Sequence, residues 1–319
     1  MNIPLIFIHQ GYSDYLNYTL RQARFSNPDA EIILIGDEFN DKFDFVKHYR
    51  ISDYPGNADS FAGVYRHMSF NSYDFELICF KRWFILEDFM IQRGLKGAFV
   101  FETDVMIYSD LTGMAEKLLN SGNNGLAVTG ESALSPHVIF WQVKTLSSFN
   151  QFLLDSYDMP EVMEKYQRKW THHVSNNLAG GICDMTALYL FNNQTAHVQY
   201  QNLLEIDHDA VFDLNINISG NLTDNEFVKI RGQKKILWHN NQPYGVTQSD
   251  NREIQFHALH LQGHAKLLLD KYYRGADFPG RKNIAFHNKL RIFKGRIRRL
   301  AAYSIKSICG KPPGSLYFP

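Results

Sequence analysis

The chain has 319 residues, of which 45% are hydrophobic and 21% charged, which is typical of a globular protein and excludes a disordered or collagen-like one. The chain has 33 basic residues (Lys and Arg together) and 33 acidic residues (Asp and Glu together). It therefore carries no net charge that would favour nucleic acid or acidic polymers as partners. Three scattered cysteines exclude a disulfide framework and a zinc ribbon: Cys79, Cys183 and Cys309. The sequence shows no secretory leader and no membrane-length apolar run, so we expect a cytoplasmic protein.

The first third of the chain alternates short apolar runs with helical patterns. In chain order we expect a strand over 5–9, a helix over 15–25, a strand over 32–35, a helix over 77–92 and a strand over 97–101. The apolar runs do not alternate with polar residues, which is typical of strands covered on both faces. The first β-α-β unit makes its two strands parallel neighbours.

Later segments carry weaker patterns. We expect strands over 126–129, 138–142, 236–239 and 254–260, and helices over 146–157, 159–174 and 184–191. The polar stretch over 207–233 is expected to form loops around short strands. No repeat or low-complexity linker divides the sequence. We therefore predict one α/β domain with a mixed central sheet over residues 1–282, followed by a basic tail over 283–319.

The tail interleaves basic and apolar residues, and it contains no Asp or Glu between Arg281 and Lys311. This composition suits a basic amphipathic helix lying on an anionic membrane or an acidic partner. It also suits a C-terminal helix that packs its apolar stripe onto the domain. The pattern leaves both alternatives open.

The triplet Glu102-Thr103-Asp104 follows the third apolar strand directly. Ligands of open α/β sheets bind at the carboxyl ends of the strands, where these two carboxylates would lie. Mg²⁺ and Mn²⁺ bind carboxylates together with phosphate oxygens. Acids also follow strands simply because loops are solvated, so the triplet alone is a weak signal.

A second motif, His260-Leu261-Gln262-Gly263-His264-Ala265-Lys266, ends the last predicted strand. Gly263 permits close approach of an anion to the backbone, and Lys266 supplies a compact positive charge for a phosphate. His260 has the chemistry to join Asp104 as a metal ligand. A single histidine is more often a core or surface residue, but the His-x-x-Gly-x-x-Lys spacing is uncommon.

Together, the two motifs resemble those of GT-A glycosyltransferases, in particular the glycogenin and lipopolysaccharide galactosyltransferase group. The resemblance implies a single α/β domain with a Rossmann-like half that binds Mn²⁺ or Mg²⁺ and a nucleotide-sugar, with a UDP-sugar as the expected donor. It implies Asp104 and His260 as metal ligands, Glu102 as a metal or ribose contact, and Gly263 and Lys266 as phosphate contacts. Two features depart from the group: Glu102 replaces an Asp, and Leu267-Leu268 replaces the usual Pro-Trp.

Three further residues are donor-site candidates under this resemblance. Asp37, at the end of the second predicted strand, would contact the base or ribose, or would only cap a turn. Lys81 and Arg82 precede the triplet on a helix, where the group often places a basic residue against the nucleotide-sugar. A salt bridge to Glu87 or Asp88 is the alternative.

The segment from Asn177 to Met185 holds a second candidate site. Gly180 and Gly181 would allow a ligand to approach the backbone, and Asp184 opens a predicted helix. The resemblance implies that Asp184 acts as the general base toward the acceptor hydroxyl or binds hydroxyls of the donor sugar. An ordinary helix N-cap is the alternative.

We therefore expect a metal-dependent glycosyltransferase that moves a sugar from a nucleoside diphosphate donor to a saccharide or lipid-linked acceptor in glycan or polysaccharide synthesis. A sugar-phosphate nucleotidyltransferase is one alternative, although His9-Gln10-Gly11-Tyr12 lacks the usual Gly-rich phosphate loop. A catalytically degenerate binding protein of the same fold is the other, and Glu102 in place of Asp is its only support.

Overall fold

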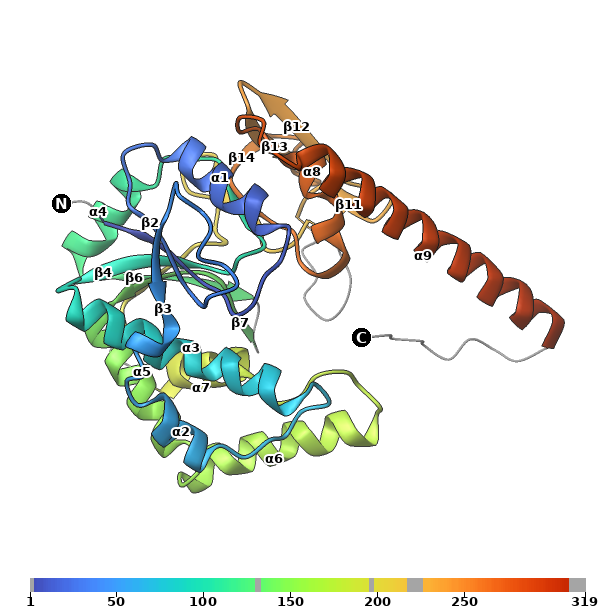
Figure 1. The fold of residues 1–319 in the computed structure, drawn as a ribbon. Helices are drawn as coiled ribbons and strands as arrows, with labels where there is room; N and C mark the ends of the chain where they lie inside the picture. The colour runs from blue at the N-terminus through green and yellow to red at the C-terminus, as the bar shows by residue number, and fades with distance from the viewer. Residues whose placement is uncertain (1–2, 130–132, 195–197, 217–225, 310–319) are drawn as a thin grey trace.

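A computed structural model describes residues 3–129, 133–194, 198–216 and 226–309 and builds them around a mixed sheet of seven strands (Figure 1). The strands of this sheet are β3 Lys47–Arg50, β2 Ile32–Gly36, β1 Leu5–Ile8, β4 Gly97–Phe101, β7 Ala133–Gln142, β6 Asn124–Thr129 and β8 Tyr200–Asn202, in spatial order. β1 to β4 are parallel, and β7 runs antiparallel to both β4 and β6. The predicted α/β class with a mixed central sheet is confirmed.

Apolar side chains cover both faces of this sheet. Along β1, Leu5 and Phe7 point into one core and Ile6 points into the other. On the Leu5 side lie α1 Leu16–Ser26 and α4 Thr112–Ser121; on the Ile6 side lie α2 Ala58–Val64, α3 Tyr73–Gln92, α5 Val143–Asp155, α6 Pro160–Ser175 and α7 Asp184–Gln194. Burial on two sides explains why the strands read as unbroken apolar runs.

A smaller sheet stands beside the carboxyl end of β4. Its strands are β12 Ile236–His239, β13 Gln242–Val246, β14 Glu253–His260 and β5 Val105–Ile107, with β9 Ala210–Phe212 pairing in parallel with β14. β10 Lys229–Ile230 and β11 Gln233–Lys234 form a separate pair. Because β5 follows β4 after a tight turn, the Glu102-Thr103-Asp104 segment joins the two sheets.

The predicted elements are found, with shifted ends and several additions. α3 begins at Tyr73, four residues before the predicted start, and α5 begins at Val143, three residues before its predicted start. The sequence patterns missed β3, α2, β5, α4, β8 and β13. Part of the predicted loop region, 217–225, lies outside the described residues.

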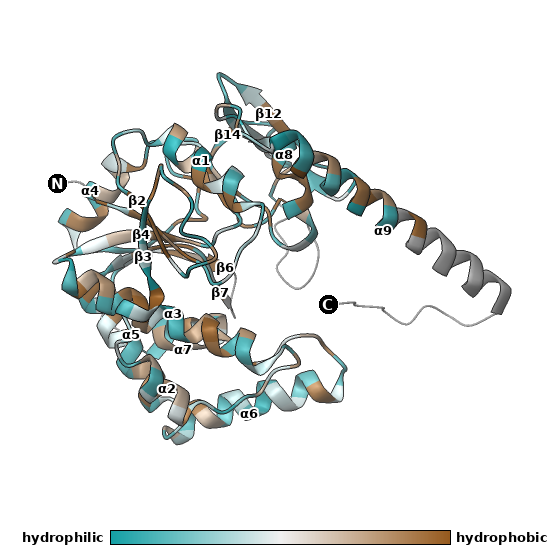
Figure 2. Ribbon diagram, in the orientation of Figure 1, coloured by the Kyte–Doolittle hydropathy of each residue, from teal (hydrophilic) through white to brown (hydrophobic). Residues whose placement is uncertain are grey.

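The tail forms α9 Arg281–Cys309, which follows η2 Gly263–Leu268 and α8 Leu269–Tyr272 and extends away from the sheets (Figure 1). Its first residue is tied down, since the Arg281 Nε donates to Asp270 Oδ1 at 2.8 Å. Apolar residues recur along the helix (Figure 2). Phe286, Leu290, Phe293 and Ile297 are exposed to 60%, 37%, 59% and 49%, so this stripe does not pack onto the domain. In the part of the chain that the structure describes, no helix is long and apolar enough to cross a membrane.

Candidate metal and nucleotide-sugar site

The turn between the two sheets fixes the acidic triplet through backbone hydrogen bonds. The Glu102 N–H donates to the His137 carbonyl on β7 at 3.0 Å, and the Val105 N–H donates to the Glu102 carbonyl at 3.1 Å. The Asp104 carbonyl accepts from the Leu261 N–H at 3.0 Å. Both carboxylates are therefore held where the large sheet ends and β14 ends.

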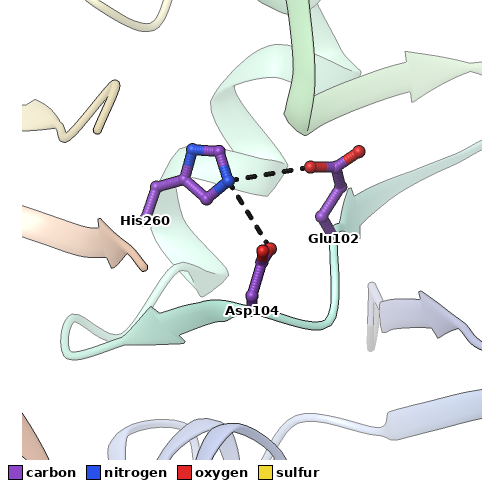
Figure 3. Close-up of side chains that lie close together, drawn as sticks. All are labelled: Glu102, Asp104 and His260. Carbon is purple, nitrogen blue, oxygen red and sulfur yellow. Dashed lines mark ion pairs between the residues drawn. The ribbon is translucent and has the colours of Figure 1, made fainter. Parts of the chain in front are cut away.

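Strand register brings His260 to the triplet. In the β5–β14 pair, His260 lies opposite Val105, and so it lies next to Asp104. The His260 Nδ1 lies 2.7 Å from the Leu214 carbonyl, which can only accept, so Nδ1 carries a proton. Nε2 then points at the two carboxylates, 3.5 Å from Asp104 Oδ1 and 3.7 Å from Glu102 Oε2 (Figure 3).

Two of these atoms are buried without a hydrogen-bond partner: Asp104 Oδ1 and His260 Nε2. An unpaired buried polar atom costs about 1–3 kcal/mol. The ligand atoms of Glu102, Asp104 and His260 all lie within 4.8 Å of one another. A divalent cation between them would satisfy both unpaired atoms, and a donor set of two carboxylates and one imidazole suits Mn²⁺. The residues present therefore fit the predicted metal.

Charges around Asp104 favour its ionised form. Burial raises the pKa of this carboxyl, but His260 and Lys266 outweigh burial and hold the pKa well below its usual range. The Lys266 Nζ lies 3.0 Å from Asp104 Oδ2. Burial lowers the pKa of His260, whereas Asp104, Glu102 and the Leu214 carbonyl raise it to about 9.

His137 is a site residue that the sequence analysis missed. Its ring stacks on that of His260 with centroids 4.6 Å apart and planes only 4° apart. Its Nδ1 lies 2.7 Å from Ser135 Oγ. Burial, and then the neighbouring His260, lower the pKa of His137 well below its usual range, so the ring is neutral. The flat face of His137 therefore limits the positions that His260 can take.

A buried ion pair supports His260 from behind. Asp213 Oδ2 accepts the His260 N–H at 3.1 Å, and the other oxygen of Asp213 binds the Lys234 ammonium. Both Asp213 and Lys234 are buried. The same segment supplies the Leu214 carbonyl that sets the His260 tautomer, so this pair holds the backbone that orients the imidazole.

Asp184, the predicted base, lies at the start of α7 as expected, and its side chain belongs to a second cluster. The Arg82 guanidinium donates to Asp184 Oδ2 at 2.6 Å and to Glu102 Oε1 at 3.1 Å. Trp83 Nε1 also donates to Asp184 Oδ2, at 3.2 Å. Arg82 thus links the predicted base to the predicted metal ligand, and the structure brings all three residues together.

The neighbouring Lys81 is turned away from this cluster. Successive helical residues differ by about 100° around the axis, so only one of the two basic residues can face Glu102. The Lys81 Nζ pairs with Asp59 of α2 at 2.8 Å. The alternative pairing with Glu87 or Asp88 is wrong, and no described contact joins Lys81 to the cluster.

The paired glycines approach the chain itself. A Cβ on Gly181 would lie 2.3 Å from the Met68 carbonyl oxygen, because Gly181 bridges to Ser69. Gly180 has φ +76° and faces open space. Glycine is therefore required at position 181 because the chain packs there against Met68 and Ser69. Of the two predicted ligand contacts, only Gly180 remains open to a ligand.

Asp37 ties together the loops that follow β1 and β2. Its Oδ2 accepts the Gly11 N–H at 2.5 Å, and its Oδ1 accepts the Phe39 N–H at 3.0 Å. Thr103 plays a similar part nearby, since its Oγ1 lies 3.1 Å from His9 Nδ1 and 3.2 Å from the Tyr15 hydroxyl. These contacts shape the loops where the base or ribose was predicted to bind.

Gly263 and Lys266, the predicted phosphate contacts, line one large cleft. The cleft has a volume of about 1450 Å³ and is bounded by residues 12–15, by η2 and by α9. Gly263 has φ +57°, and no atom lies within 4 Å of where its Cβ would be. The open backbone and Lys266 thus face the same space.

No family model matches the chain, and no curated protein matches its sequence. Several solved structures resemble parts of its fold, among them three glycosyltransferases. Mouse xyloside xylosyltransferase 1 is 10% identical, with 64% of this chain and 85% of that chain covered and a TM-score of 0.44. The galactosyltransferase LgtC, in complex with donor and acceptor sugar analogues, is 13% identical, with 63% and 73% covered and a TM-score of 0.37. The glycosyltransferase GlyE of Streptococcus pneumoniae is 12% identical, with 63% and 45% covered and a TM-score of 0.34.

The fold of the chain is similar to parts of these glycosyltransferases, the class whose motifs the sequence resembles. At such identities and TM-scores, the likeness concerns the arrangement of elements, and no functional argument rests on it. The function is inferred from the side chains of the site.

Proposed function

We propose that this chain is a metal-dependent glycosyltransferase that transfers a sugar from a nucleoside diphosphate donor, with UDP as the first candidate, to a saccharide or lipid-linked acceptor in glycan or polysaccharide synthesis. The observation that carries the proposal is the Glu102–Asp104–His260 cluster, in which Asp104 and His260 are buried and present two unpaired ligand atoms beside Lys266. A divalent cation beside a lysine ammonium, here the one that pairs with Asp104 Oδ2, is an arrangement suited to a diphosphate leaving group.

The roles on the donor side follow from position. Glu102, Asp104 and His260 would hold Mn²⁺ or Mg²⁺, which supplies positive charge against the departing diphosphate. Lys266 and the backbone at Gly263 would contact the phosphates. Asp37 would contact the ribose or base from the loop after β2. Lys81, which was also predicted as a donor contact, faces away from the cluster and would reach the donor only after leaving Asp59.

The sugar-binding roles centre on Asp184 and Gly180. Both hydrogen bonds to the Asp184 carboxylate reach Oδ2, from Arg82 and Trp83, which fixes the direction of the group. Asp184 would then accept the proton of the acceptor hydroxyl, from within about 3 Å, or bind a donor-sugar hydroxyl. Arg82 would orient Asp184 and Glu102 toward the same sugar.

A transfer screen tests the proposal. The protein is incubated with UDP-glucose, UDP-galactose and UDP-xylose plus Mn²⁺, and UDP release is measured with and without a saccharide acceptor. We expect release with one donor, loss of release in EDTA, and loss in Asp104→Asn. Equal release in the wild type and in Asp104→Asn, or no release from any of the three donors, would contradict the proposal.

We also propose that α9 places the enzyme on an anionic membrane surface, at the inner face in the cytoplasm. Support comes from the exposed stripe of Phe286, Leu290, Phe293 and Ile297, in a segment that lacks acidic residues. Phe286→Ser/Phe293→Ser should reduce sedimentation with phosphatidylglycerol vesicles. Two results would contradict this placement. One is that wild type and variant sediment equally with the vesicles; the other is that the wild type sediments equally with phosphatidylcholine and phosphatidylglycerol vesicles.

A further inference from the structure

The cleft that contains Lys266 is larger than a nucleotide-sugar needs. Its volume is about 1450 Å³, whereas pockets for small ligands usually measure about 300–1,000 Å³. One end reaches the metal cluster, because Lys266 lines the cleft and contacts Asp104. The other end reaches α9, beyond any position assigned to the donor. The space therefore has room for a second molecule.

Basic side chains gather around this second end. Arg231, in the turn between β10 and β11, lines the cleft together with Arg291 and Lys294 of α9. Among the described residues that line the cleft, Asp14 is the only acidic one. Among the described residues, no carboxylate lies within 4 Å of Arg231, Arg291 or Lys294, in a chain whose charges otherwise balance.

The side of α9 that lines the cleft differs from the side that carries its apolar stripe. Asn288, Ile292 and Gly295 are half-buried and line the cleft, whereas Phe286 and Phe293 are exposed. At about 100° per residue, these two sets lie on opposite sides of the helix. One side of α9 therefore belongs to the substrate cleft, independently of what the other side contacts.

Unpaired cations that share one cleft repel one another, and an anion between them removes that repulsion. A phosphate is the anion that two arginines and a lysine bind best, because guanidinium groups match its oxygens in pairs. The donor diphosphate is already matched by Lys266 and the metal cluster. Arg231, Arg291 and Lys294 are thus left for another phosphate.

We propose that this cleft binds a phosphate group of the acceptor, so that the acceptor is a phosphorylated molecule; its identification as the acceptor rests on the proposed glycosyl transfer. The phosphate would come from a lipid phosphate or from a soluble phosphorylated glycan or polyol. Leu267, Leu268 and Ile292 offer apolar surface beside the cations.

Calorimetric titration with two phosphate probes tests the proposal. Farnesyl monophosphate represents the lipid phosphate and glycerol 3-phosphate the soluble one, with farnesol and glycerol as uncharged controls. Titrations are performed in EDTA and again with saturating UDP and Mn²⁺. We expect at least one phosphate probe to bind under both conditions, and its uncharged control to bind far more weakly.

Matched variants locate the binding. Arg291→Ala/Lys294→Ala should weaken phosphate binding by about tenfold or more, because each charged hydrogen bond contributes strongly to affinity. Lys282→Ala/Lys289→Ala removes two charges from the same helix outside the cleft lining and should leave binding unchanged. Thermal melts confirm that both variants fold. Binding of farnesyl monophosphate alone assigns the lipid source, and binding of glycerol 3-phosphate assigns the soluble one.

Three results would overturn the proposal. They are equal binding of phosphate and alcohol, unchanged binding in Arg291→Ala/Lys294→Ala, and displacement of the probe by UDP with Mn²⁺, which would make the cleft part of the donor site. Failure of UDP to bind at all would contradict the proposed transfer and the acceptor assignment, while phosphate binding in EDTA would still establish the anion site.

Discussion

Two carboxylate clusters meet at Glu102 and differ in how their charge is balanced. In one, Arg82 and Trp83 complete the hydrogen bonds of Asp184. In the other, Lys266 pairs with Asp104 Oδ2, but Asp104 Oδ1 and His260 Nε2 are buried and face each other without a hydrogen bond. A carboxylate completed by the protein's own arginine needs no external cation, whereas the second cluster has unpaired atoms that a metal ion would bind. The difference is why the metal is assigned to Asp104 and His260.

The largest effect is expected on stability, when Arg82, the cation that pairs with Asp184, is removed. Arg82→Met leaves Asp184 buried without its partner, so the free energy of unfolding should fall by about 3–5 kcal/mol. Urea denaturation measures this change. Lys81→Met, on the same helix with an exposed partner, is the matched control and should change stability little. Equal stabilities of the two variants would show that the Arg82–Asp184 cluster is not held together by its charges.

A smaller effect is expected at the stacked histidine. His137→Leu removes the face that His260 rests on, so Mn²⁺ affinity should fall by about tenfold while the fold is kept. Electron paramagnetic resonance of free Mn²⁺ gives the affinity, and thermal melting checks the fold. His257→Leu is the control, since His257 is half-buried in the same sheet region but contacts Ser109 instead of His260. Equal Mn²⁺ affinities in the two variants would remove the positioning role of His137.

The smallest effect concerns a third carboxylate near the Arg82–Asp184 cluster. Burial, and to a lesser degree Asp184, raise the pKa of Glu76, whose Oε1 accepts from Ser69 at 2.9 Å and from Asn71 at 2.7 Å. The folded protein therefore holds this proton to a higher pH than the unfolded chain does. Its stability contribution is present below the unfolded pKa, about 4.3, and is lost as the pH rises through the folded pKa.

Glu76→Gln keeps an oxygen for both hydrogen bonds and removes the charge. The free energy of unfolding of the variant should be higher than that of the wild type at pH 7, and nearly equal to it at pH 4. Urea denaturation at the two pH values measures this. A wild type more stable than the variant at pH 7 would mean that the Glu76 charge is balanced within the cluster.

The sequence predicted most of the large sheet, because strands buried on both faces leave unbroken apolar runs such as Ile32 to Ile35. It did not predict β5 or β13: β5 has only three residues, and Pro243 and Gly245 interrupt β13. The polar edge strand β3 was not predicted for a similar reason, since Lys47 to Arg50 contains no apolar run.

The Glu102–Asp104–His260 cluster could be predicted from two motifs, but the residues that support it could not. His137 and Asp213 reach His260 from β7 and from the segment after β9, and nothing local in the sequence marks either contact. Helical periodicity did not decide between Lys81 and Arg82, because the side facing the site depends on the packing of α3. The glycine at position 181 indicated that another group approaches the backbone closely, but the sequence did not show that this group is the backbone at Met68.

Calorimetric titration of UDP into the wild type and into Asp104→Asn, each with and without Mn²⁺, tests the central claim most directly. Asparagine keeps the shape of the side chain and removes the charge that the cation requires. We expect UDP binding that depends on Mn²⁺ in the wild type and is lost in the variant. Binding that is equally strong without Mn²⁺, or unchanged in Asp104→Asn, would contradict a metal site at Glu102, Asp104 and His260.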